Sequence, residues 1–199
     1  MAKSKVDIAN MALSYVAAGG GIQSLEESSD DALAVTTHYD DVLATLLREH
    51  PWNFARRYLS LALLADVDLP SRWTYPYAYP ADCVEFRGID GETEDLNIPF
   101  EIAYGAGARI IFTNIQDAIG VYTALVEDPV YYPPDFTTAF ARRLADAIAP
   151  RVTGGDHPEL IRFNADRMLT AVDMAKVKDA LENRVAPFSS SDRLRGRRV

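Results

Sequence analysis

The side chains best suited to catalysis or metal binding are three histidines and one cysteine, and they are scattered along the chain. His38, His50 and His157 lie in different segments, and no two of them have the spacing of paired metal ligands. Cys83 has no histidine or lysine beside it in the sequence, although a reactive thiolate depends on a neighbour of that kind. We therefore expect structural or solvent-exposed histidines, a buried and inert thiol, no metal site and no cofactor.

Two further segments contain part of a ligand-binding motif. The glycine run 19–21 follows an expected helix rather than a strand, Ser24 occupies the place of the third glycine of a dinucleotide-binding loop, and no phosphate-binding lysine follows. The acidic run 90–95 lacks the spacing of an EF-hand calcium loop, so a solvated hairpin turn is expected there. The sequence thus predicts no catalytic residues, and we expect that the chain is not an enzyme.

An aromatic segment stands out between residues 73 and 80. Trp73, Tyr75, Tyr77 and Tyr79 alternate with small residues and prolines, and the missing proline N–H groups exclude a central strand, so a loop is expected. Exposed Trp and Tyr bury a large area at little entropic cost, which favours a protein-contact surface. The sequence equally supports a second interpretation, in which the segment is a lid over the core of its own β region.

The C-terminal segment 187–199 is rich in serine and arginine, a composition that cannot form a hydrophobic core. Arg193, Arg195, Arg197 and Arg198 supply planar, forked donors for carboxylates or phosphates. An extended segment of this length reaches roughly 43 Å. The tail is therefore long enough to leave its own subunit and bind a neighbour.

Composition and charge exclude several classes of protein. The 199 residues are 48% hydrophobic and 25% charged, as in globular chains that form a core without disulfides or metals. The net charge is −9, and residues 189–199 contribute four arginines and one aspartate, which leaves −12 on the other 188 residues. An acidic body disfavours wrapping of nucleic acid. The longest apolar run, 58–67, is too short to span a membrane, so a soluble protein is expected.

Helical periodicity marks both ends of the chain. The first predicted helix is capped by Ser4, with Asp7 completing a capping box, and ends at the glycine run 19–21. The second begins at Ser28 or Ser29 and ends near Pro51. Its apolar stripe consists of Ala32, Val35, Tyr39, Val42, Leu43 and Leu46. Residues 52–55 are expected to add a short turn.

Two more helices are predicted near the C-terminus. One follows the prolines at 133 and 134, is capped by Asp135, and bends or ends at Pro150. The other is capped by Asp156, has Pro158 in its first turn and runs to about Asn183.

The middle of the chain is typical of β structure. Strands are expected at 58–65, 84–87 and 121–126, and segments 100–102 and 109–112 flank a glycine turn at 105–107 as a hairpin would. The order of helices, strands and helices predicts an α+β fold. In it, residues 1–57 and 129–186 form a helical bundle, 58–128 form a central antiparallel β insertion, and 187–199 form an extended basic tail.

Several motifs, in their order and spacing, make the chain resemble the tail tubular protein A family, the head-to-tail adaptor or gatekeeper proteins of tailed bacteriophages. The most telling motif is LREHPWNFARR at 47–57. The others are IANMAL at 8–13, IQSLEES at 22–28, WTYPYAYPADC at 73–83, PFE at 99–101, RIIFTN at 109–114, YT at 122–123, PDF at 134–136 and TG at 153–154.

This resemblance implies a non-enzymatic structural protein of the virion neck, assembled in the host cytoplasm. Members of the family form a dodecameric ring that joins the portal protein to the tail nozzle or tail tube. The ring continues the channel through which genomic DNA passes without specific binding. The resemblance leaves open the tail type and the attachment of tail fibres.

The resemblance also assigns contact residues. Trp73, Tyr75, Tyr77 and Tyr79 would contact the tail nozzle. The portal-binding residues would be those of the tail: Phe188, Arg193, Leu194, Arg195, Arg197, Arg198 and Val199.

Two other functions stay open at this point. One is a small acidic α+β enzyme with an unrecognised site in the β insertion, which would need a deep pocket with converging polar groups. The other is a nucleic-acid-binding module that uses the arginine-rich tail. Its binding would depend steeply on salt and would be lost when the tail is removed.

Overall fold

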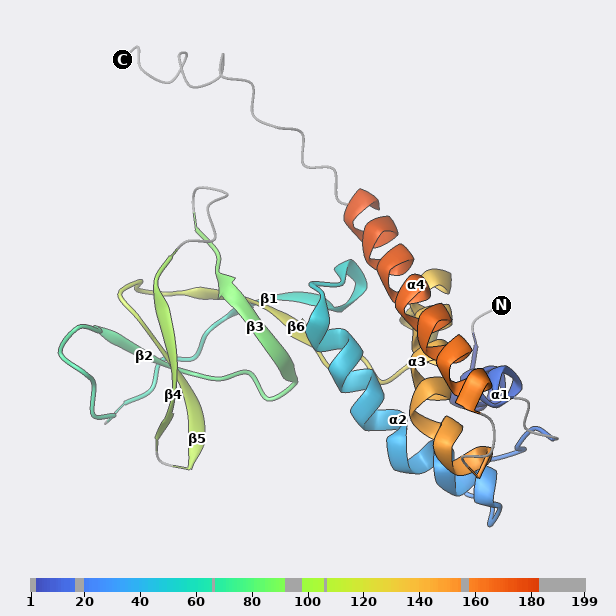
Figure 1. Cartoon of the computed structure of the whole chain (residues 1–199). Helices are drawn as coiled ribbons and strands as arrows, with labels where there is room; N and C mark the ends of the chain where they lie inside the picture. The colour runs from blue at the N-terminus through green and yellow to red at the C-terminus, as the bar shows by residue number, and fades with distance from the viewer. Residues whose placement is uncertain are drawn as a thin grey trace, which may run out of the picture.

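The computed structural model describes residues 3–16, 20–65, 67–91, 98–105, 107–154 and 158–182, and the tail 187–199 lies outside them. The described part holds four α-helices and two antiparallel sheets of three strands each, so the predicted α+β class is confirmed. The helices gather on one side of the molecule and the strands on the other (Figure 1). The chain enters the β part after α2 and returns to the bundle after β6.

The first two helices follow their predicted signals. Helix α1 (Lys5–Tyr15) has Ser4 as its N-cap, and Ser4 and Asp7 form the reciprocal hydrogen bonds of a capping box. It ends before the glycine run. Helix α2 (Asp30–Glu49) is capped by the Ser29 side chain and ends two residues before Pro51. A short 3-10 turn, η1 (Asn53–Ala55), follows, as expected.

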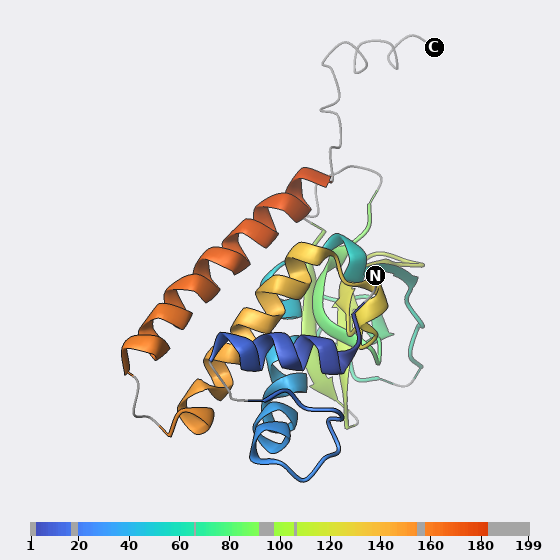
Figure 2. The ribbon, with the colours of Figure 1, turned by 90° about the vertical axis from the view of Figure 1, so that its right-hand side faces the viewer.

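Helix α3 (Pro134–Val152) is the centre of the bundle. It packs against α4 (Pro158–Glu182) and also against α1 and α2. Figure 2 shows α4 on one side of α3 and α1 on the other. The predicted cap by Asp135 is wrong, because the helix begins one residue earlier, with Pro133 as an N-cap that makes no side-chain bond. Pro150 lies in the last turn of α3, and the predicted cap at Asp156 lies outside the described residues.

Six strands form the β part. The first sheet has the order β1 (Arg56–Ser60), β6 (Ile119–Ala124), β3 (Cys83–Ile89), and the second has the order β2 (Tyr75–Ala78), β5 (Ala108–Thr113), β4 (Phe100–Gly105). The predicted hairpin is present as β4 and β5, which pair from Phe100 opposite Thr113 to Gly105 opposite Ala108. Gly107 in its turn has φ +81°, a conformation that favours glycine.

Two strand predictions need correction. The expected strand 58–65 is shorter and lies earlier, as β1, because the chain leaves β6 after Ser60. The expected loop at 73–80 is wrong over Tyr75–Ala78, which is the strand β2. Pro76 is tolerated there because β2 lies at the end of its sheet, hydrogen-bonded in a full ladder only to β5.

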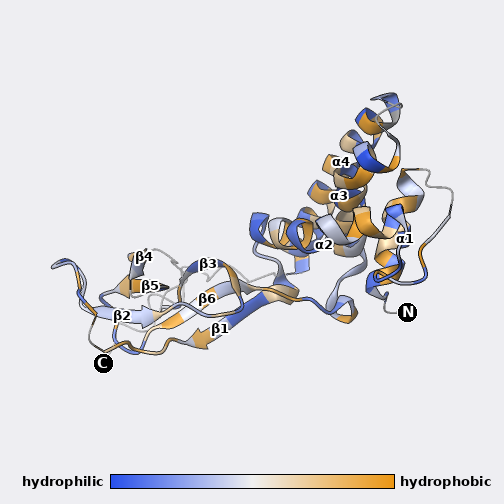
Figure 3. Cartoon of the chain, turned by 90° about the horizontal axis from the view of Figure 1, so that it is seen from below, coloured by the Kyte–Doolittle hydropathy of each residue, from blue (hydrophilic) through white to orange (hydrophobic). Residues whose placement is uncertain are grey.

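The two parts have separate hydrophobic cores. One cluster of buried residues joins all four helices, and a second lies between the two sheets. Seen from below, the β part extends away from the bundle (Figure 3). The residues that hold the two parts together are therefore important for the shape of the whole molecule.

Candidate interaction surfaces

The segment 47–57, between α2 and β1, forms the junction of the bundle with the β part. Trp52 is buried in the core of the bundle, and its indole Nε1–H donates to the Leu46 carbonyl over 2.8 Å. The His50 ring packs edge-on against Trp52, with 4.7 Å between the ring centroids. The predicted structural role of His50 is thus supported by its surroundings.

Asp179 of α4 closes this junction from the other side. It is buried, and its carboxylate accepts from the Asn53 backbone N–H at 2.9 Å and lies 2.9 Å from His50 Nε2. The Asn53 side-chain amide in turn donates to the Asp179 carbonyl over 2.6 Å. A buried carboxylate is stable only when it is hydrogen-bonded in this way. One side chain thus fixes the end of α4 against η1.

Arg87 of β3 fixes the sheet to the end of α2. Its guanidinium donates to the carbonyls of Leu47, Arg48 and His50, at 3.3, 2.8 and 3.0 Å, and to Thr123 Oγ1 of β6 at 2.9 Å. The last carbonyls of a helix lack partners within it and carry partial negative charge, so a cation there is stabilising. Arg48 adds an ion pair to Glu85 at 2.7 Å.

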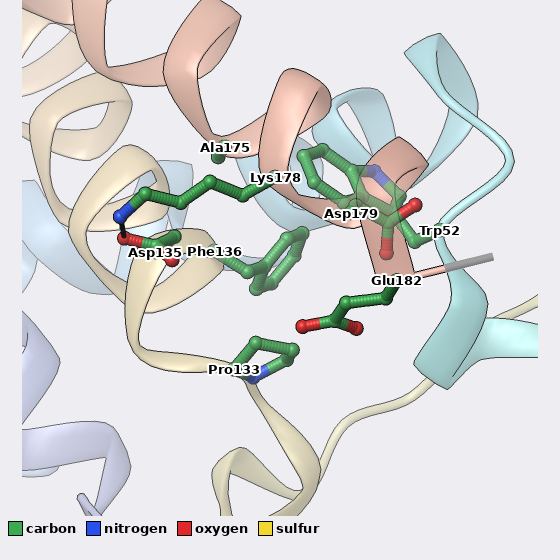
Figure 4. A pocket seen from close by; sticks show the side chains of 8 residues that line it. All are labelled: Trp52, Pro133, Asp135, Phe136, Ala175, Lys178, Asp179 and Glu182. Carbon is green, nitrogen blue, oxygen red and sulfur yellow. Dashed lines mark hydrogen bonds and ion pairs between the residues drawn. The ribbon is translucent and has the colours of Figure 1, made fainter. Parts of the chain in front are cut away.

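The hollow beside this junction is too small for a substrate (Figure 4). It has a volume of about 10 Å³, which is the room that one water molecule needs. Trp52, Phe136 and Asp179 are among its lining side chains. We interpret it as a packing defect between α3 and α4.

A wider, open groove of about 280 Å³ lies in the β part beside Cys83 and Arg109. Cys83 is the side chain of its lining that could serve as a thiol nucleophile. Burial, however, raises the pKa of the Cys83 thiol to about 11, and the hydrogen bond from Sγ to Tyr79 Oη, 3.2 Å long, does not offset that effect. The thiol is therefore protonated at neutral pH, which disfavours nucleophilic catalysis.

We expect Cys83 to react with iodoacetamide roughly 100-fold more slowly in the folded chain than in the unfolded chain. The reason is the difference between a pKa of about 11 and the ordinary value of 9.0, which lowers the thiolate fraction by that factor near pH 8. Labelling rates followed by mass spectrometry, with and without guanidinium, test this. Equal labelling rates for the folded and the unfolded chain would show an accessible thiolate and would support the alternative in which the chain is an enzyme.

The aromatic residues at 73–79 are bonded within the β part. The Tyr77 hydroxyl donates to the Ile115 carbonyl over 2.9 Å, and its side chain is only 2% exposed, so it cannot be a surface contact. Trp73 Nε1–H donates to Glu101 over 2.7 Å, and Arg72 pairs with the same carboxylate. Tyr75 and Tyr79 are half-buried and pack against the β core. These contacts favour the interpretation of the segment as a cover for its own core.

The other predicted residues are not brought together. His38 is half-buried on α2, whereas His157 and the tail residues Phe188, Arg193, Leu194, Arg195, Arg197, Arg198 and Val199 lie outside the described residues. Within the described ranges, no three His, Cys, Asp or Glu side chains are grouped so that they could hold a metal ion. No helix in the same ranges is both long and apolar enough to span a membrane.

No protein-family model matches this chain, and no curated protein is significantly similar to it. Its function must therefore be argued from its own motifs and geometry.

Sequence reasoning missed Arg87, which joins the sheet to the end of α2, and Asp179, which joins α4 to η1. A signal was present for each. Arg87 is a charged residue in the middle of a β-forming run, and Asp179 stands one helical turn after Ala175 on the inner face of a helix. A charge at a core position indicates a buried partner.

Proposed function

We propose that this chain is a structural subunit of the head-to-tail adaptor of a tailed bacteriophage, located in the virion neck. The observation that carries the proposal is the segment 47–57. It is the strongest of the motifs that resemble the tail tubular protein A family, and its residues converge on the junction between bundle and β part. The motif thus coincides with the part of the structure that sets the shape of the molecule.

A two-part shape suits a connector. The bundle and the β part have separate cores, and the β part extends away from the helices, so each offers its own surface to a different partner. In the proposed arrangement the bundle and the C-terminal tail bind the portal protein, and the β part faces the tail nozzle or tail tube. Of the aromatic residues proposed for that second contact, the partly exposed Trp73, Tyr75 and Tyr79 are retained.

Charge is consistent with a channel wall. The residues before the tail carry a net charge of −12, and a surface of the same sign as DNA lets the duplex pass without being gripped. The basic tail has the opposite sign and suits docking to an acidic surface of the portal. This division of charge makes the tail the most specific feature to test.

We expect removal of residues 187–199 to leave folding intact and to abolish binding to the portal protein encoded with this chain. The described cores contain none of these residues, whereas the tail carries the proposed portal contacts. Circular dichroism melting measures folding, and co-sedimentation with purified portal rings measures binding. Full binding of the truncated chain would contradict the proposed role of the tail.

A matched pair of full-length variants shows how the tail binds. Charge reversal at Arg195 and Arg197 is expected to weaken portal binding by about 10-fold or more, and lysine at the same positions by less, if charge dominates. Equal losses would mean that the planar, bidentate geometry of arginine is required. Binding unchanged in both variants would exclude these two residues from the contact.

A further inference from the structure

The short 3-10 turn η2 (Pro129–Tyr131), which precedes α3, presents two large apolar side chains to solvent. Val130 and Tyr131 each leave more than half of their surface exposed, whereas the neighbouring Tyr132 is buried. The Asp128 carboxylate accepts from the Val130 backbone N–H over 3.0 Å and so holds the turn in this conformation. The exposure of the two side chains is therefore built into the turn and needs its own explanation.

The surroundings of the η2 turn are acidic. Glu127 and Asp128 precede it and are both exposed, and the exposed Glu182 at the end of α4 lies on the same side of the bundle, beside the residues that follow the turn. The cation nearest to Glu182 along α4, Lys178, already forms an ion pair with Asp135 at 2.5 Å. The turn thus presents apolar side chains beside excess negative charge.

The cations of the neighbouring elements are engaged elsewhere. Arg56 and Arg57, at the start of β1, donate to main-chain carbonyls of the residues just before them. Arg143 of α3 and Lys176 of α4 both pair with Glu49 of α2. The acidic surface around the η2 turn therefore favours a partner that combines apolar and positive side chains.

The chain itself supplies such a partner where α4 ends. The segment 183–199 follows Glu182 and contains Phe188 and the four arginines of the tail. Glu182 lines the same hollow as Pro133, which stands only two residues after Tyr131 (Figure 4). Two residues span at most roughly 7 Å, and the six residues from Glu182 to Phe188 reach up to roughly 20 Å. Phe188 can thus reach the η2 turn while α4 keeps its full length.

We propose that the tail 187–199 folds back onto the η2 turn of its own chain, with Phe188 packed on Val130 and Tyr131 and the tail arginines facing Glu127 and Asp128. Attachment to the end of α4 keeps the tail at a high effective concentration beside the turn, so a weak contact suffices to hold it. The same tail carries the proposed portal contacts. The fold-back therefore competes with portal docking, a consequence that rests on the proposed function.

Trypsin cleavage within the tail of the full-length chain tests the contact, because a protease cuts the released form in proportion to its population. Cleavage after Arg193 and Arg195, followed by mass spectrometry, is expected to be at least about 3-fold slower in the folded chain than in a synthetic peptide of residues 183–199. Tyr131→Ser is expected to bring the rate close to that of the peptide. The matched control is Tyr104→Ser, at an exposed tyrosine of β4, and it is expected to keep the wild-type rate.

Salt tests the charged half of the contact. Raising NaCl from about 0.05 M to about 1 M screens exposed charges, so the slower cleavage of the chain relative to the peptide is expected to diminish. Equal protection at both salt concentrations overturns the proposed pairing of the arginines with Glu127 and Asp128.

Three results overturn the fold-back itself. They are a wild-type tail that is cut as fast as the peptide, an equal change in Tyr131→Ser and Tyr104→Ser, and protection that grows with chain concentration, since the tail would then bind another copy. Circular dichroism confirms that each variant is folded. None of these measurements uses the portal protein, so failure of the fold-back is distinguishable from failure of the proposed portal docking.

Discussion

Replacement of Trp52 by alanine is expected to lower the free energy of unfolding by about 3–5 kcal/mol. The side chain is 1% exposed and lies where α2, η1 and α3 meet. Its ring packs edge-on against Phe136, with centroids 4.9 Å apart, and against His50. Alanine would leave a cavity there and would also leave the Leu46 carbonyl without its hydrogen bond.

The other tryptophan is the matched control. Trp73 is half-buried in the β part, and its indole N–H donates to the Glu101 carboxylate, so Trp73→Ala is expected to cost about 1 kcal/mol. Urea unfolding followed by far-UV circular dichroism gives both values without relying on tryptophan fluorescence. Equal losses for the two variants would show that Trp52 is not the centre of the bundle core.

Replacement of Arg87 by alanine is expected to cost about 2–4 kcal/mol. The guanidinium donates to three carbonyls at the C-terminal end of α2 and to Thr123 of β6, and burial lowers the pKa of Arg87 from its ordinary value. Without it, partly buried carbonyls of the helix end would lose their partner. Arg87→Lys is expected to recover part of the loss, because an ammonium cannot reach all four acceptors at once.

Arg109→Ala provides the comparison for a surface arginine. Arg109 donates to the Tyr104 hydroxyl over 3.0 Å and lies at the exposed end of the β4–β5 hairpin, so its removal is expected to change the free energy of unfolding by less than about 1 kcal/mol. The same urea titration measures both variants. An Arg87→Ala variant as stable as Arg109→Ala would mean that the bundle and the β part are held together by other contacts.

The parts of the fold that were predicted correctly depend on local signals. Ser4 and Asp7 cap α1 through bonds between residues three apart, and Pro51 ends α2 because it cannot continue a helix. The β4–β5 hairpin needs only two β-forming runs and glycine at its turn. Each of these features is decided by a few neighbouring residues.

The parts that were missed depend on contacts between distant residues. Asp179 meets Asn53 across 126 positions of sequence, and Arg87 meets Arg48 across 39, so neither bond has a local signature. Proline is tolerated in β2 because that strand lies at the edge of its sheet. The residues of the segment 73–80 do not by themselves specify an edge position. The exposed apolar side chains of α4, among them Phe163, Met174 and Val177, were likewise not foreseen, since a helix with apolar residues all round has no clear amphipathic pattern.

We propose that this chain forms the adaptor ring of a phage neck. The most direct measurement is electron microscopy of the purified full-length chain mixed with rings of the portal protein encoded with it. We expect a ring of this chain stacked under the portal, with the β part pointing away from it. Portal rings that remain bare at saturating concentrations of the folded chain would contradict the claim.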